Sequence, residues 1–141
     1  MRGHLEIDAS RCTGCNSCVL TCAFAHEEAF SLSKGRLRIN ADPISAEYTP
    51  RVCVQCDDAA CIDSCPTGAL SVNWATGAIQ LDRAACIGCQ ACVSACPYSG
   101  IFFDEVSRKP LICDLCDGNP QCVAVCQRPQ AIRFIDRARK E

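Results

Sequence analysis

The sequence predicts an α+β fold made of two modules that are related by internal duplication, one inserted in the other. Cysteine accounts for 16 of the 141 residues, far above the usage of an ordinary soluble protein. The cysteines recur in closely spaced quartets, and the segments that precede the quartets repeat along the chain. Two unlike kinds of quartet, each present twice, indicate a duplicated unit.

The first repeat is a short alternating strand that leads into a C-x-G-C turn. Residues 3–8 (GHLEID) precede Cys12 as residues 77–82 (GAIQLD) precede Cys86, at a constant offset of 74. The alternation of apolar and polar residues predicts a strand in each copy.

A turn and a short helix are expected after each of these strands. Gly14 and Gly88 stand where a positive φ would turn backbone N–H groups toward a bound anion. Short helices are expected over residues 16–21 and 90–95. The second repeat follows later in each half, where residues 50–53 (PRVC) match residues 110–113 (PLIC) at an offset of 60.

The cysteine spacings predict iron-sulfur clusters. The four quartets are Cys12, Cys15, Cys18, Cys22; Cys53, Cys56, Cys61, Cys65; Cys86, Cys89, Cys92, Cys96; and Cys113, Cys116, Cys122, Cys126. Quartets one and three have the spacing C-x2-C-x2-C-x3-C that binds [4Fe-4S] clusters in bacterial ferredoxins. Quartets two and four only lengthen the gap before the third cysteine.

Disulfides and zinc are the alternative uses of so many cysteines. Disulfides suit secreted chains, and cysteines two residues apart are poorly placed to bridge different parts of a fold. Structural zinc sites normally take two separated pairs of ligands rather than compact quartets.

The apolar core must be thin, because the aromatic content is only 6%. We therefore expect the chain without clusters to be largely unfolded.

Linkers and prolines predict which quartets share a module. Residues 66–82 read as a compact β-hairpin with a turn at 73–77 that joins quartets two and three. The last cysteines of these two quartets are both followed by proline. We therefore expect an inner two-cluster ferredoxin module at residues 49–105 and, by elimination, an outer module at 1–48 and 106–141. The rival pairing joins quartet one to two and three to four.

In bacterial two-cluster ferredoxins the fourth cysteine of each quartet binds the neighbouring cluster. Exchange of that cysteine within each module gives four predicted ligand sets, which are named here by letter. Set a is Cys12, Cys15, Cys18 and Cys126; set b is Cys113, Cys116, Cys122 and Cys22; set c is Cys53, Cys56, Cys61 and Cys96; set d is Cys86, Cys89, Cys92 and Cys65.

Charge and hydropathy narrow the location and the partners. Sixteen thiolates and four oxidised cores of charge +2 would take the formal net charge from −2 to about −10, which disfavours nucleic acid as a partner. The first residues show no signal peptide, and no apolar run approaches the length of a membrane span. We expect a cytoplasmic protein, although a chain exported together with a signal-bearing partner would look the same.

Four further features each allow a functional or a purely structural interpretation. His26 is expected to be structural, with a hydrogen bond to a cluster sulfide as the alternative; His4 is expected to have no special role. Trp74, at the expected hairpin tip, either packs on its own hairpin or anchors a partner. The basic residues Arg133, Arg137, Arg139 and Lys140 suit either a solvated helix end or a docking site for an acidic partner.

The chain resembles the four-cluster ferredoxin-like subunits of molybdenum and tungsten oxidoreductases, the family of the dimethyl sulfoxide reductase and formate dehydrogenase iron-sulfur subunits. The four quartets in order, CPTGAL at 65–70 and CDLCD at 113–117 carry this resemblance over nearly the whole length. Residues 22–27 (CAFAHE) and 35–39 (GRLRI) look like the smaller subunits that accompany tungsten aldehyde oxidoreductases and carbon monoxide dehydrogenases.

The resemblance implies a non-catalytic electron-transfer subunit with four [4Fe-4S] clusters. It would relay electrons from a large tungsten- or molybdenum-containing catalytic subunit, an aldehyde oxidoreductase, to a further acceptor. A second redox subunit or further copies of the chain are additional expected partners, and no direct membrane span is expected. The alternative is a free soluble polyferredoxin that shuttles between enzymes such as carbon monoxide dehydrogenase and hydrogenase.

Overall fold

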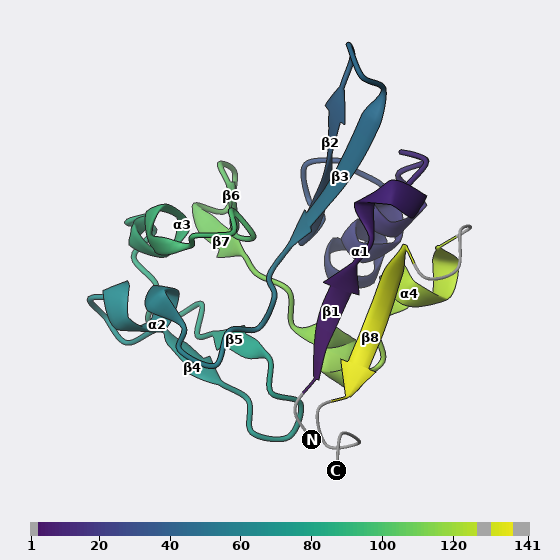
Figure 1. Ribbon diagram of the computed structural model, residues 1–141. Helices are drawn as coiled ribbons and strands as arrows, with labels where there is room; N and C mark the ends of the chain where they lie inside the picture. The colour runs from purple at the N-terminus through teal and green to yellow at the C-terminus, as the bar shows by residue number, and fades with distance from the viewer. Residues whose placement is uncertain (1–2, 127–130, 137–141) are drawn as a thin grey trace.

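The computed structural model describes residues 3–126 and 131–136, and it confirms an α+β protein of short helices and strands (Figure 1). The helices are α1 (Ser17–Glu27), α2 (Ala60–Ser64), α3 (Ala91–Ala95) and α4 (Gln121–Val125), with 3-10 turns η1 (Ala9–Arg11) and η2 (Leu115–Gly118). The strands are β1 (Gly3–Ile7), β2 (Leu37–Asp42), β3 (Glu47–Val52), β4 (Leu70–Val72), β5 (Ile79–Leu81), β6 (Phe102–Asp104), β7 (Lys109–Leu111) and β8 (Ile132–Asp136).

The described strands form four two-stranded antiparallel sheets. Three of them are hairpins, β2–β3, β4–β5 and β6–β7. The fourth joins the beginning of the chain to its end, because β1 pairs with β8 from Gly3 opposite Asp136 to Ile7 opposite Ile132. The two outermost strands therefore close one lobe of the molecule, as Figure 1 shows.

The three hairpins share one turn geometry. In each turn a side-chain oxygen accepts a hydrogen bond from the backbone N–H two residues further on, which stabilises the turn locally. The acceptors Asp42, Asn73 and Asp104 bond the N–H groups of Ile44, Ala75 and Val106 at 2.9, 3.0 and 3.1 Å. The expected hairpin with its turn at 73–77 is confirmed, and the hairpins at 37–52 and 102–111 are additional to the sequence prediction.

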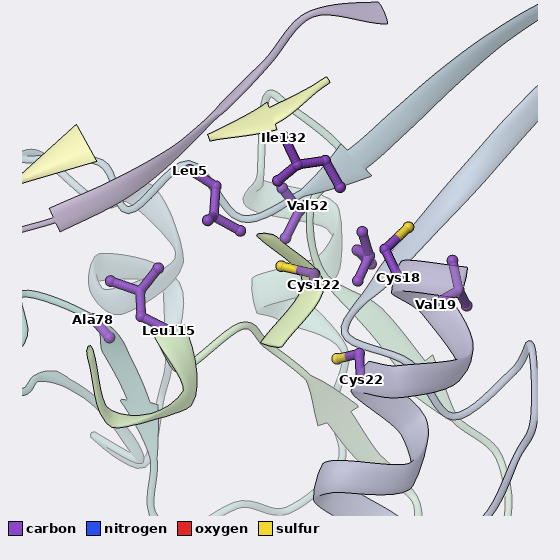
Figure 2. Close-up of a cluster of buried hydrophobic side chains, with 10 residues drawn as sticks. Leu5, Cys18, Val19, Cys22, Val52, Ala78, Leu115, Cys122 and Ile132 are labelled. Carbon is purple, nitrogen blue, oxygen red and sulfur yellow. The ribbon is translucent and has the colours of Figure 1, made fainter. Parts of the chain in front are cut away.

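Two lobes result, each with its own apolar cluster. Helix α1 packs against α4, and α2 packs against α3. Figure 1 shows the first pair beside β1 and β8 and the second pair beside the hairpins β4–β5 and β6–β7. In the first lobe, Cys18, Cys22 and Cys122 lie among the apolar side chains of Leu5, Val52, Leu115 and Ile132 (Figure 2). In the second, Cys53, Cys61 and Cys92 lie among Leu70, Ile79, Ile101 and Ile112.

The borders of the predicted modules fall inside two of the hairpins. The border at 48/49 lies within β3, and the border at 105/106 lies in the turn between β6 and β7. In Figure 1 the chain passes from one lobe to the other only after β3 and again after β7. The division into an inserted and an outer module stays a prediction, with its natural borders at the ends of these hairpins.

A buried ion pair holds the segment after α1 to the β6–β7 hairpin. Lys34 Nζ donates to both carboxylate oxygens of Asp104 at 2.8 Å, and the Asp104 side chain is only 9% exposed. The hydrogen bond from Lys34, with help from the Ser107 hydroxyl and the Val106 N–H, holds the pKa of Asp104 well below its usual range. Across residues 3–126 and 131–136, none of the helices has the length and apolar character to cross a bilayer.

Candidate iron-sulfur sites

The C-x-G-C turns adopt the same backbone conformation in both halves of the chain. Gly14 and Gly88 have φ of 70° and 71°, and the residues that cap the next helices, Asn16 and Gln90, have φ of 62° and 64°. The predicted positive φ of both glycines is thus confirmed, as are helices after both turns, although α1 runs on to Glu27. A side chain at either glycine would be strained by the left-handed conformation alone.

Hairpin residues cover both turns closely. A Cβ at Gly14 would lie 2.4 Å from the Tyr48 ring, and a Cβ at Gly88 would lie 2.6 Å from the carbonyl oxygen of Arg108. Tyr48 belongs to β3 and Arg108 precedes β7. The two hairpins that were not predicted from the sequence therefore form a wall beside each turn.

Three of the four predicted ligand sets surround cavities of their own. Set a (Cys12, Cys15, Cys18, Cys126) lines one cavity, set d (Cys65, Cys86, Cys89, Cys92) a second, and set c (Cys53, Cys56, Cys61, Cys96) a third. The three cavities have the same volume, about 20 Å³ each. Similar size and the same four-sulfur lining suit one kind of cofactor in all three.

Set b contains two buried cysteines, Cys22 and Cys122, and two partly buried ones, Cys113 and Cys116. Burial raises the pKa of the Cys113 thiol well above its ordinary value, and the neighbouring thiols of Cys122, Cys53 and Cys22 raise it further. Burial also raises the pKa of Cys122 to about 12, again with Cys116 and Cys22 nearby. The structure thus brings the members of sets a, c and d to one cavity each and places cysteines of set b near one another. The four ligand sets and their role in binding iron stay a prediction.

The buried thiols have the chemistry of metal ligands. Burial raises the pKa of Cys18 and of Cys61 to about 11, and that of Cys53 to about 12. A buried thiolate is costly unless a cation offsets its charge, and bound iron would supply that charge at each set. The donor set therefore fits iron-sulfur clusters.

Backbone N–H groups donate to several cysteine sulfurs, with the same spacing at more than one quartet. The N–H groups of Gln55 and Leu115 each lie 3.4 Å from the sulfur of the cysteine two residues earlier. Those of Ala69 and Gly100 reach Cys65 and Cys96, four residues earlier, at 3.3 and 3.4 Å. Such bonds stabilise thiolate charge and are one means by which a protein sets cluster potential.

His26 lies against set b. Its Nε2 is 2.9 Å from Asp114 Oδ1, while its Nδ1 is 2.9 Å from the carbonyl oxygen and 3.7 Å from the sulfur of Cys22. The Asp114 carboxylate, followed by Cys22, raises the pKa of His26 to about 11. One ligand atom from each of His26, Asp114 and Cys116 lies within 4.8 Å of the others. His26 thus contacts the sulfur of a predicted ligand, Cys22, while a hydrogen bond from His26 to a cluster sulfide stays a prediction.

The other residues weighed from sequence are also placed by the structure. Trp74 is 72% exposed in the β4–β5 turn, and His4 lies in β1 opposite Ile135. The helix end expected at Arg133 is wrong, because Arg133 lies in strand β8, where it forms an ion pair with Glu6 of the adjacent strand β1. Arg137, Arg139 and Lys140 lie outside the described residues.

Sequence reasoning gave no role to Gln55 or Asp114. Both stand between the first two cysteines of a quartet, at Cys53-Val54-Gln55-Cys56 and Cys113-Asp114-Leu115-Cys116. Polar residues inside such a turn were the available signal, since they lie close to the sulfurs whatever the fold.

The chain belongs to the 4Fe-4S dicluster domain family, whose sequence pattern matches residues 44–137; a 4Fe-4S binding domain also matches residues 9–25. Together these matches span all four quartets.

Named relatives include iron-sulfur proteins of several systems. The polyferredoxin-like subunit of the aliphatic sulfonate oxidoreductase of Pyrococcus furiosus is 40% identical over 120 residues, which cover 85% of this chain and 69% of the relative. The electron transport protein HydN of Escherichia coli K12 is 34% identical over an aligned length of 167 residues, gaps included. This alignment covers 100% of this chain and 92% of HydN.

Other similarities are to parts of larger assemblies. The beta subunit of the NADH-dependent phenylglyoxylate dehydrogenase of Aromatoleum evansii is 36% identical, but this chain spans only 28% of that protein. Among solved structures, the active site complex BamBC of benzoyl coenzyme A reductase has a chain that matches with a TM-score of 0.57 and 26% identity, covering 94% of this chain and 77% of that chain.

Proposed function

We propose that this chain is a non-catalytic electron-transfer subunit that holds four [4Fe-4S] clusters and relays electrons between a catalytic subunit and a further acceptor. The observation that carries the proposal is a set of three cavities, each lined by three cysteines of one quartet and the last cysteine of another. The nearness of Cys22 to Cys122 supports the same arrangement for set b. This is the ligand exchange of two-cluster ferredoxins.

The same assembly supports the division into two modules. Cys126 joins the first quartet, and Cys22 lies beside the fourth, as an outer module of residues 1–48 and 106–141 requires. Cys96 joins the second quartet and Cys65 the third, as an inner module of residues 49–105 requires. The rival pairing would have joined Cys65 to the first quartet and Cys126 to the third.

Neighbouring thiols of different sets support a linear order of the four sets along the path of the electrons. Cys122 of set b has Cys18 of set a as a neighbour, and Cys113 of set b has Cys53 of set c. Cys61 of set c has Cys92 of set d as a neighbour. We therefore infer the order a, b, c, d.

The two sets at the ends of this order each contain one exposed cysteine. Cys15 of set a and Cys89 of set d are the exposed members among the sixteen cysteines, all of which the structure describes. Electrons would enter near one of these residues and leave near the other. Sets b and c, which contain no exposed cysteine, would carry them between the lobes.

Each cluster, when bound, supplies one-electron redox chemistry, and the residues of this chain hold and tune it. The cysteines fix position, backbone N–H groups offset negative charge on sulfur, and the apolar clusters around sets b and c exclude water. No general acid, base or nucleophile is needed for this function.

The catalytic partner proposed is a large tungsten- or molybdenum-containing oxidoreductase subunit, an aldehyde oxidoreductase. The resemblance of residues 22–27 and 35–39 to subunits that accompany such enzymes supports it. Similarity to the polyferredoxin-like subunit of an oxidoreductase and to a chain of the BamBC active site complex supports a catalytic partner in general. A second redox subunit or further copies of this chain would complete such an assembly.

Anaerobic purification of the tagged chain from its own cells tests the proposal. We expect a large subunit to copurify in a fixed ratio, with tungsten or molybdenum in the complex and reduction of the chain's clusters when an aldehyde is added. A complex without either metal would refute the partner assignment.

A free electron carrier is the second candidate, and the match to nearly all of HydN, which is named an electron transport protein, favours it. This function predicts a monodisperse monomer in cell extract that accepts electrons from carbon monoxide dehydrogenase or donates them to hydrogenase.

A further inference from the structure

The Gln55 carboxamide occupies the junction between the two lobes. Gln55 is 2% exposed and stands in the turn that carries Cys53 and Cys56, with φ of 53°. Its Nε2 donates to the carbonyl oxygen of Cys113 at 2.7 Å, and its Oε1 accepts from the N–H of Ile79 at 2.8 Å. One buried amide thus ties together the turn of quartet two, strand β5 and the first cysteine of quartet four.

Both bonds are made in an apolar environment, where they are strong and costly to lose. Cys53 and Ile112 flank this junction in the apolar cluster of the second lobe, and Cys113 packs against that cluster. A buried polar group that loses its partner pays the full cost of desolvation. The amide therefore constrains the position of Cys113 relative to Cys53.

Comparison with the repeated half separates the role of the Gln55 side chain from the role of its backbone. At the equivalent position in quartet four stands Leu115, with φ of 58° and 0% exposure. Its N–H bonds the sulfur of Cys113 at 3.4 Å, as the N–H of Gln55 bonds that of Cys53. The turn and its sulfur bond thus form equally well with an apolar side chain, so the amide has a separate role.

We propose that Gln55 is a positioning residue for electron transfer between the lobes. Its amide fixes Cys113 of set b against Cys53 of set c, and so it sets the magnetic coupling and the reduction potentials of the two central clusters. This inference rests on the proposed function, because it requires clusters at sets b and c.

Two substitutions at Gln55 test the proposal. Gln55→Leu installs the residue of the repeated half and removes both amide bonds. Gln55→Glu keeps the shape and the acceptor for Ile79. Once the pH is high enough to ionise this buried carboxyl, the substitution also removes the donor to Cys113 and adds negative charge. Gln80→Leu is the matched control, because Gln80 is exposed next to Ile79 and bonds only the Ser71 hydroxyl among the contacts described.

The readouts are iron content, reduction potentials from a titration followed by EPR, and the magnetic interaction between reduced clusters. We expect both Gln55 variants to keep about sixteen irons per chain, with a weakened interaction and shifted potentials for one pair of clusters only. In Gln55→Glu those potentials should fall as the pH is raised and the carboxyl ionises, because added negative charge disfavours reduction. Gln80→Leu should match the wild type.

If the magnetic interaction between clusters and their reduction potentials are unchanged in both Gln55 variants, the proposal for Gln55 is overturned. The proposed function would still stand in that case, because the clusters are present. Loss of iron from both variants would also overturn it, because the residue would then serve cluster retention rather than coupling. If only Gln55→Leu loses iron, the potentials of Gln55→Glu decide. A wild-type chain without iron would instead refute the proposed function.

Discussion

Three glycines allow two costs of adding a side chain to be measured separately. One is the stability lost to a left-handed backbone conformation, and the other is the stability lost to overpacking. Gly68 has φ of +65° with nothing within 4 Å of its would-be Cβ. Gly100 lies outside the left-handed region, but its Cβ would lie 2.7 Å from the carbonyl oxygen of Val52. Gly88 combines both constraints, with φ of +71° and a Cβ 2.6 Å from the carbonyl oxygen of Arg108.

The expected costs follow from these two constraints. Gly68→Ala should destabilise the native state by about 1–2 kcal/mol, the penalty for a side chain in the left-handed region. Gly100→Ala should cost about 1–3 kcal/mol through overpacking against backbone. Gly88→Ala should cost the sum, roughly 2–5 kcal/mol, and should disturb the turn that carries Cys86 and Cys89.

Anaerobic unfolding in guanidinium, followed by the loss of cluster absorbance, measures these effects as rates because cluster loss is irreversible. Each 1.4 kcal/mol of native-state cost raises the unfolding rate by up to about tenfold. Gly68→Ala should therefore unfold up to about 30-fold faster than the wild type, and Gly88→Ala faster than either other variant. A Gly88→Ala protein as stable as Gly68→Ala would refute the assigned contact with the β6–β7 hairpin.

Three further changes test the site and the fold. Asp104→Asn should speed unfolding severalfold at pH 7. Because the folded pKa of Asp104 is depressed, its stabilisation is fully present above the unfolded pKa of about 4 and is lost as the pH falls from there through the folded pKa. The difference in unfolding rate from wild type should therefore shrink as the pH falls below about 4, and a constant difference would contradict the ion pair with Lys34. Cys126→Ala should lose the EPR signal of one cluster and keep three, and loss of a cluster from quartet three instead would favour the rival pairing. His26→Phe removes a polar contact 3.7 Å from the Cys22 sulfur, so the potential of one cluster should fall in an EPR titration; an unchanged potential would place His26 outside the site's electrostatics.

Local chemistry made much of the fold predictable from the sequence. Quartet spacing, the glycine in each C-x-G-C turn and the alternating residues of 77–82 each concern a few neighbouring residues. The helix after Cys15, the hairpin turn at 73–77 and the positive φ of Gly14 all follow from such short patterns. The repeat added long-range information, because it indicated which quartets are equivalent.

Contacts between distant segments escaped sequence reasoning. Lys34 meets Asp104 across 70 residues, and His26 meets Asp114 across 88. Nothing in the local sequence of either partner indicates the other. The hairpins at 37–52 and 102–111 were also missed, although each has an aspartate in the position that Asn73 occupies in the predicted hairpin. That shared turn residue was a usable signal.

Iron and acid-labile sulfide analysis of the anaerobically purified chain, together with its zinc content, tests the central claim most directly. Four [4Fe-4S] clusters predict about sixteen irons and sixteen sulfides per chain, with no stoichiometric zinc. About eight irons or fewer in material that is otherwise fully folded, or zinc in place of iron, would contradict the assignment of sixteen cysteines to four clusters.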